Sequence, residues 1–175
     1  MKRIPAPDYT EHALYYEPFV AKVRTDISVL DQLKEQQQSV LQLLKTTPKP
    51  LLETPYAPGK WSILDLVQHL IDCERVFVYR AMRFARNDRS PLPFFDENVF
   101  AEEARMNSLS ASKLAKEYKT NRQATLAFYN NLSAKAIKRS GIASSFTMSV
   151  RASVWIIAGH EKHHLDVIHE RYPLS

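Results

Sequence analysis

Glycine is scarce in this sequence, with only three glycines among 175 residues. A β-rich fold of this length would need many tight turns, and glycine is the residue that most readily adopts the positive φ angles of such turns. Apolar residues make up 45% of the chain and charged residues 25%, which is the balance of an ordinary globular protein. We therefore expect an all-α fold, with one domain over residues 1–175 and a sizeable core.

Apolar residues recur at helical spacing in four stretches, which predicts a four-helix bundle. The first stretch has an apolar seam that is interrupted at Lys34 and Gln37. The second opens with Ser62, which can cap a helix, and Asp65 follows in its first turn, where a carboxylate suits the positive end of the helix dipole. The predicted helices cover residues 18–45, 62–86, 110–132 and 149–172.

Three connections separate these helices. Residues 46–60 hold four prolines and Gly59, so this segment is predicted to contain no helix. Residues 87–107 form a long connection with a short helix at about 97–104, and residues 133–148 form another that contains Gly141. Long connections are typical of bundles in which some consecutive helices are not joined by tight turns.

The ends and charges of the chain exclude several classes of function. Residues 1–17 are a polar N-terminal extension without the apolar core of a signal peptide, and no apolar run reaches the length of a membrane span. The 24 basic residues are spread among 19 acidic ones, so the net charge of +5 does not form a nucleic-acid-binding block. A single cysteine, Cys73, excludes an intramolecular disulfide. We expect a cytoplasmic protein with neither a nucleic-acid nor a membrane partner.

Histidines carry the clearest chemical signal. His160 and His164 lie four residues apart within a predicted helix, so both imidazoles can reach one point. His69 lies between Leu66 and Leu70 on the apolar face of the second helix. Three histidine ligands would leave a coordination position open, which is typical of a catalytic metal site. The imidazoles would suit zinc, nickel and other divalent ions.

The spacing alone leaves other interpretations open. His69 could be a hydrogen-bonded core residue, and His163 could replace His164 as a ligand or act as an acid or base. Asp72 and Glu161 could accept a hydrogen bond from a ligand imidazole or act as general bases, or they could be solvated or paired with arginines. Arg80, Arg83 and Arg86 fall in the last turns of the second predicted helix. We interpret them as cations that interact favourably with the negative end of the helix dipole.

Several motifs together resemble the DinB/YfiT-like superfamily. They are Trp-Ser-Ile-Leu-Asp-Leu-Val-Gln-His at 61–69 with Asp72, Glu74 and Arg75, Arg-Phe-Ala-Arg-Asn-Asp at 83–88, Pro-Leu-Pro-Phe-Phe-Asp at 91–96, and Gly-His-Glu-Lys-His-His at 159–164. The resemblance covers about residues 20–172. It implies an up-down-down-up four-helix bundle, a homodimer, and a metal triad at His69, His160 and His164.

The resemblance also implies a range of activities. Some members transfer or use a low-molecular-weight thiol with electrophilic small-molecule substrates, and others are described as metal-dependent hydrolases without a known substrate. We therefore expect a metal-dependent enzyme that holds one divalent cation, zinc or nickel, with thiol transfer as the first hypothesis. A hydrolase and a non-catalytic metal-binding bundle are the alternatives.

Overall fold

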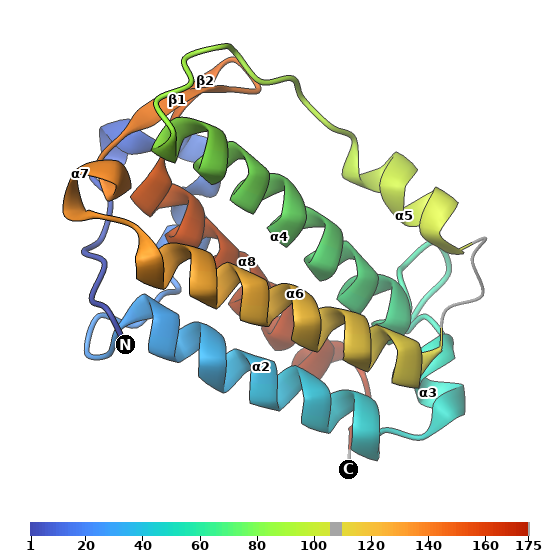
Figure 1. Ribbon diagram of the computed structural model, residues 1–175. Helices are drawn as coiled ribbons and strands as arrows, with labels where there is room; N and C mark the ends of the chain where they lie inside the picture. The colour runs from blue at the N-terminus through green and yellow to red at the C-terminus, as the bar shows by residue number, and fades with distance from the viewer. Residues whose placement is uncertain (106–109, 175) are drawn as a thin grey trace.

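A computed structural model describes residues 1–105 and 110–174, and its main feature is a bundle of four long helices (Figure 1). α2 and α8 run in one direction along the bundle, and α4 and α6 run in the other, so the predicted up-down-down-up topology is confirmed. The four helices are α2 (Val29–Thr46), α4 (Ile63–Ala85), α6 (Ala111–Asn131) and α8 (Val150–Arg171).

α2 and α4 lie at opposite corners of this bundle, as do α6 and α8, whereas α4 and α6 are neighbours. α4 packs against α8 and α6, and α2 packs against α6 and α8 (Figure 1). The chain must therefore cross the end of the bundle between α2 and α4 and again between α6 and α8. This arrangement explains why the connections are long. It also brings α4 beside α8, the two helices that carry the candidate histidines.

Helix capping agrees with the prediction at the start of α4. The Ser62 hydroxyl accepts a hydrogen bond from the Asp65 N–H at 3.1 Å, and the Asp65 carboxylate accepts one from the Ser62 N–H at 2.8 Å. This reciprocal pair satisfies two backbone N–H groups that lack helical partners. Serines at positions 28, 110, 133 and 149 cap α2, α6, α7 and α8 in the simpler one-bond form.

The prediction of one unbroken helix over residues 18–45 is wrong. The structure has a short α1 (Glu17–Val20) and then a break before α2 begins at Val29. Val23 continues the apolar spacing of this stretch, but it is buried within the break rather than on a helix. The Arg24 N–H donates a hydrogen bond to the Gln32 side chain at 2.9 Å. A side chain of α2 thus provides the acceptor for a backbone N–H group within the break.

The prediction that residues 46–60 contain no helix is also wrong. α3 (Lys49–Glu53) forms there with Pro48 at its N-cap and Pro50 in its first turn. Proline is tolerated at these positions because the first N–H groups of a helix have no helical partner. Leu52 is buried and anchors this turn to the core.

Residues 133–148 were predicted only as a connection, but they contain defined structure. α7 (Ala134–Ile137) is followed by a hairpin of β1 (Ser140–Ala143) and β2 (Phe146–Ser149), with Ser140 opposite Ser149. The turn residues Ser144 and Ser145 both have positive φ angles. Leu92 pairs with the hairpin at Ala143, so the long connection after α4 lies against it.

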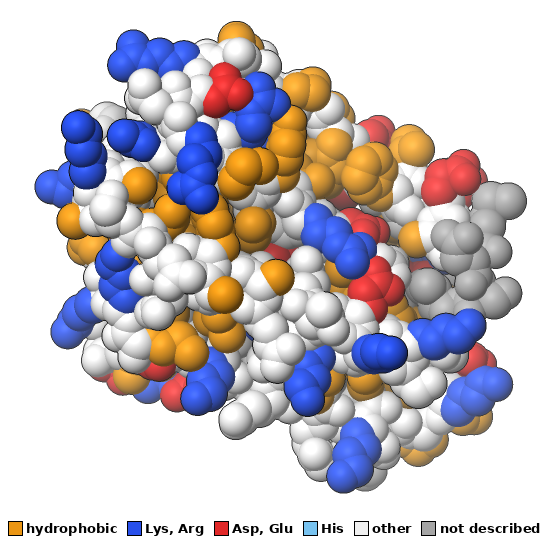
Figure 2. Space-filling model, in the orientation of Figure 1, with side chains coloured by type: hydrophobic (Ala, Val, Ile, Leu, Met, Phe, Trp, Pro, Cys, Tyr) orange, Lys and Arg blue, Asp and Glu red, His pale blue; other side chains and the backbone are white. Residues whose placement is uncertain are grey.

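The remaining elements lie outside the four-helix core. η1 (Tyr9–Glu11) and η2 (Leu14–Tyr16) are short turns of 3₁₀ helix, and α5 (Glu97–Arg105) confirms the short helix predicted within the connection 87–107. Residues 106 and 107 of that connection lie outside the described residues. Hydrophobic side chains gather on the surface over α4 and α5 (Figure 2), where Phe94, Val99 and Phe100 are exposed. Within the described ranges, no helix is both long and apolar enough to cross a membrane.

Candidate metal centre

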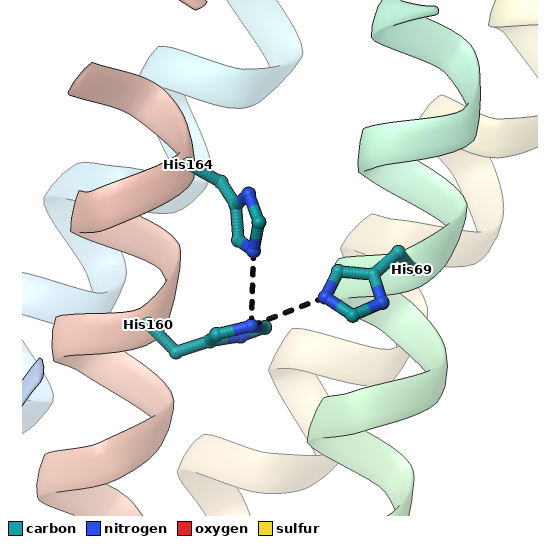
Figure 3. A group of neighbouring side chains, drawn as sticks. All are labelled: His69, His160 and His164. Carbon is teal, nitrogen blue, oxygen red and sulfur yellow. Dashed lines mark hydrogen bonds between the residues drawn. The ribbon is translucent and has the colours of Figure 1, made fainter. Parts of the chain in front are cut away.

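His69 from α4 and the pair His160 and His164 from α8 point toward one another (Figure 3). The Nε2 atom of His160 lies 3.1 Å from Nε2 of His69 and 3.0 Å from Nε2 of His164. One nitrogen from each ring lies within 4.8 Å of the others. The packing of α4 against α8, together with the four-residue spacing on α8, therefore brings the three predicted residues into a single cluster.

The donor set of this cluster fits a divalent metal ion. Nitrogen ligands placed about 2.0–2.1 Å from a tetrahedral zinc ion lie about 3.3 Å from one another, close to the separations of the His160 nitrogen from its two neighbours. Three neutral imidazoles also match the ligand preference of zinc, nickel and copper. The cluster can thus hold such an ion with small adjustments of the rings.

Burial keeps these imidazoles neutral. Removal from water lowers the pKa of His69 to about 4 and that of His164 to about 3, with the neighbouring histidines adding to the shift at His164. The pKa of His160 is lowered well below its ordinary value, by burial first and then by the neighbouring histidines 164, 69 and 163. A neutral imidazole has a free nitrogen lone pair, which is the form that binds a metal.

Neighbouring side chains hold the rings in place. The Sγ atom of Cys73, one turn after His69, lies 3.6 Å from Nδ1 of that histidine. The Trp61 ring lies 4.7 Å from the His69 ring, and the Phe19 ring lies edge-on at 5.2 Å from the His160 ring. Burial raises the pKa of the Cys73 thiol, so this thiol stays protonated near neutral pH.

A cavity of about 460 Å³ opens onto the three histidines. Its wall is mostly aromatic and comes from segments that are far apart in the sequence. η2 and α1 supply Tyr16 and Phe19, the connection after α4 supplies Phe94 and Phe95, and the hairpin supplies Phe146. A cavity that joins a metal-binding cluster to an apolar wall can hold a small organic molecule beside the metal.

His163 lies in this cavity wall next to the cluster. Its ring is 5.1 Å from the His164 ring and 5.4 Å from the Phe19 ring. The group of nitrogens that could hold a metal consists of His69, His160 and His164. His163 therefore borders the centre at a position from which it could exchange a proton with a molecule in the cavity.

The two carboxylates considered from the sequence have other partners. Asp72 is half-buried, accepts a hydrogen bond from Gln68 at 3.1 Å, and lies 3.6 Å from Arg75. Glu161 is buried, and both of its oxygens are bound by Arg122 and by the hydroxyl of Tyr118. Of the interpretations that the sequence left open, pairing with nearby arginines is the one that matches these contacts.

Sequence reasoning missed the N-terminal contribution to the site. The segment 1–17, treated as an extension, packs through the buried side chain of Ile4, whose carbonyl accepts a hydrogen bond from the Trp155 indole at 3.2 Å. Tyr16 and Phe19 then reach the cavity. In the sequence, only the aromatic character of Tyr16 and Phe19 pointed to a role in a binding site. No hydrophobic periodicity indicated that they would pack beside α8.

The comparisons with known proteins agree with the fold. YfiT from Bacillus subtilis, described as a probable metal-dependent hydrolase with an unusual four-helix bundle topology, is 20% identical and matches with a TM-score of 0.71 over 85% of this chain and 90% of its own. The mycothiol-dependent maleylpyruvate isomerase is 14% identical, with a TM-score of 0.62 over 79% of this chain, which spans 60% of that enzyme. TT2238, a four-helix bundle protein, is 18% identical, with a TM-score of 0.54 over 81% of this chain and 96% of its own.

No match was found among curated proteins. The family comparison is decisive, because the model of the DinB superfamily matches residues 32–168 and so includes all three histidines of the cluster. The chain belongs to the DinB superfamily.

Proposed function

We propose that this protein is a metal-dependent enzyme that holds one divalent cation, zinc or nickel, through His69, His160 and His164. Its reaction would join a low-molecular-weight thiol to an electrophilic small molecule. The observation that carries the proposal is the convergence of three neutral imidazoles, one buried and two half-buried, in the wall of a largely apolar cavity. A divalent cation held there would supply Lewis acidity, which lowers the pKa of a thiol or of water.

The residues of the chain would have separate tasks in this reaction. Phe19 and Trp61, which contact His160 and His69, would keep bulk water from the reacting atoms. His163 would take up the proton that the thiol releases, or return a proton to the leaving group. Cys73 would hold the ring of His69 through its contact with Nδ1, because its own thiol stays protonated.

A metal-dependent hydrolase is the second candidate. YfiT, which shares the fold, is described as a probable metal-dependent hydrolase. Glu97 at the start of α5 lies in the cavity wall and would serve as the base that hydrolysis requires. The first candidate needs no such carboxylate, because a thiol is far more acidic than water.

Turnover assays with metal-loaded protein separate the candidates. One panel combines chlorodinitrobenzene with glutathione, bacillithiol or mycothiol, and the other contains nitrophenyl esters and anilides. We expect turnover that requires a thiol and is lost in His160→Ala. Hydrolysis without any thiol would favour the second candidate, and tight metal binding without turnover in either panel would favour a non-catalytic metal-binding bundle.

Two further properties stay predictions from the family resemblance. We propose a homodimer, which light scattering coupled to size-exclusion chromatography would detect as a mass near twice the 20.2 kDa of the chain. We also propose a cytoplasmic location, which cell fractionation would test. A monomer at micromolar concentration would contradict the first of these predictions.

A further inference from the structure

Arg80 on α4 is a buried cation without an acidic partner among the described residues. It is 2% exposed, as deeply buried as the side chains of the core. Arg122, the other buried arginine in the described part of the chain, is bound by two carboxylates, those of Glu74 and Glu161. A buried charge is costly unless it is paired, so an uncompensated guanidinium requires an explanation.

The hydrogen bonds of Arg80 use only part of its guanidinium. Nη2 donates to the carbonyl of Pro93 at 2.9 Å and to the hydroxyl of Ser144 at 2.8 Å. Nη1 is buried and has no hydrogen-bond partner. The guanidinium also lies 5.4 Å from the centre of the Phe95 ring and 5.9 Å from that of Phe77. These aromatic contacts stabilise a cation, and the Tyr16 hydroxyl also interacts with the guanidinium, but Nη1 has no acceptor at hydrogen-bond distance.

Arg80 lies directly behind the wall of the cavity that contains the histidines. Phe77, Phe95 and Ser144, which surround its guanidinium, all line that cavity. Arg80 also lies on the same face of α4 as His69, because eleven residues are close to three full turns. The two residues are therefore about 16 Å apart along the helix axis, with Cys73 and Phe77 between them in the cavity wall.

We propose that the cavity binds an elongated, largely apolar molecule that ends in a carboxylate, and that Arg80 receives this carboxylate while the other end of the molecule lies at the three histidines. A carboxylate supplies both the missing negative charge and an acceptor for Nη1. Phe95 is half-buried and belongs to the connection after α4. Binding in this way requires the Phe95 ring to move aside and uncover the guanidinium. The position of the reactive end rests on the proposed function, but the role of Arg80 does not.

The test compares ligands that differ only at the far end. Cobalt-loaded protein is titrated with mercaptoundecanoic acid and with its methyl ester, and binding is followed by calorimetry and by the absorption that a thiolate gives with cobalt. We expect the acid to bind about 10-fold or more tightly than the ester, as removal of a charge-assisted hydrogen bond typically costs. In Arg80→Met this preference should disappear while the ester binds as before.

Two further variants control for charge and folding. Arg83→Met removes a guanidinium that is already paired with Asp88 and stacked on Tyr79, so it should leave the preference intact. Arg80→Lys keeps the positive charge but loses the two parallel donors of the guanidinium, so its preference for the acid should be reduced but still present. If Arg80→Met does not fold, the binding of acid and ester by Arg80→Lys is the test of the proposal. Equal binding of acid and ester by the wild type, or an unchanged preference in the folded Arg80 variants, would overturn the proposal.

The same titrations distinguish failure of the proposal from failure of the proposed function. If no thiol changes the cobalt spectrum, thiol activation fails, and undecanoic acid is then titrated into the wild type and Arg80→Met. Weaker binding of this acid by Arg80→Met than by the wild type still supports the carboxylate site, and equal binding by the two proteins overturns it.

Discussion

Gly159 on α8 faces the backbone of Phe19 so closely that a Cβ atom at position 159 would lie 1.8 Å from the Phe19 carbonyl oxygen. This contact seats α1 against α8 directly before His160. It also holds the Phe19 ring against the rings of His160 and His163. The close approach of two backbones thus determines one wall of the candidate metal centre.

Gly159→Ala should therefore destabilise the protein. In an isolated helix this substitution would gain about 1 kcal/mol in helix propensity. Here the added methyl group must push α1 away, so we expect a net loss of about 1–3 kcal/mol in the free energy of unfolding. Urea unfolding would measure it, with the exposed position Lys162→Ala as a control on the same helix. A variant as stable as the wild type would contradict the account of this contact.

Glu161→Gln should separate stability from metal binding. Glu161 lies next to a candidate ligand in the sequence, but its oxygens face Arg122 at 2.6 Å and 3.2 Å and Tyr118 at 2.9 Å and 3.0 Å. Weakening this buried network should lower the free energy of unfolding by about 1–3 kcal/mol. The metal content, measured by mass spectrometry of the purified protein, should stay at the wild-type level. Loss of metal with unchanged stability would contradict this assignment.

Acidification should destabilise the metal-free protein. The pKa values of His69 and His164 are about 4 and about 3 in the fold, whereas an unfolded histidine titrates near 6.5. The unfolded chain therefore binds more protons between these values. Above pH 6.5 these histidines are neutral in both states and do not change the free energy of unfolding, which falls as the pH drops below 6.5. This loss levels off once the pH passes below the folded pKa values of about 4 and about 3. At pH 5 each histidine accounts for at most about 2 kcal/mol.

Thermal unfolding of chelator-treated protein at several pH values would measure this effect. The double variant His69→Gln and His164→Gln removes both titrating groups, so its stability should depend less steeply on pH between 6.5 and 4. An identical pH dependence in the variant and the wild type would show that other groups dominate acid unfolding.

The sequence predicted what depends on local spacing. The apolar seams gave α4, α6 and α8 to within one or two residues, and the His-x-x-x-His spacing identified two imidazoles that share a face of α8. Ser62 and Asp65 fixed the start of α4 through a capping box, which depends only on neighbouring residues. His69 lies on an apolar helix face that a bundle must bury, but spacing alone left open whether it joined the pair, and the resemblance to the DinB/YfiT-like superfamily implied the triad.

Features that depend on tertiary contacts were not predictable in this way. Val23 is buried in a non-helical segment, so hydrophobic periodicity extended the first helix too far. The turn of the hairpin is formed by Ser144 and Ser145, both with positive φ angles. An Asn-Gly or Asp-Gly pair, which usually indicates such a turn in a sequence, does not occur at this position. Arg80 was assigned to the helix dipole, and only the packing of Phe95 and Ser144 around it shows that it is buried.

The metal content of two adjacent variants tests the central claim most directly. His163 and His164 both lie in the cavity wall, but only His164 belongs to the group of three converging nitrogens. The protein, supplied with zinc and nickel during expression, would be purified and analysed by mass spectrometry for bound metal. We predict about one ion per chain in the wild type and in His163→Ala, and a loss of most of that metal in His164→Ala. A wild-type protein without metal, or equal metal contents in the two variants, would contradict the account.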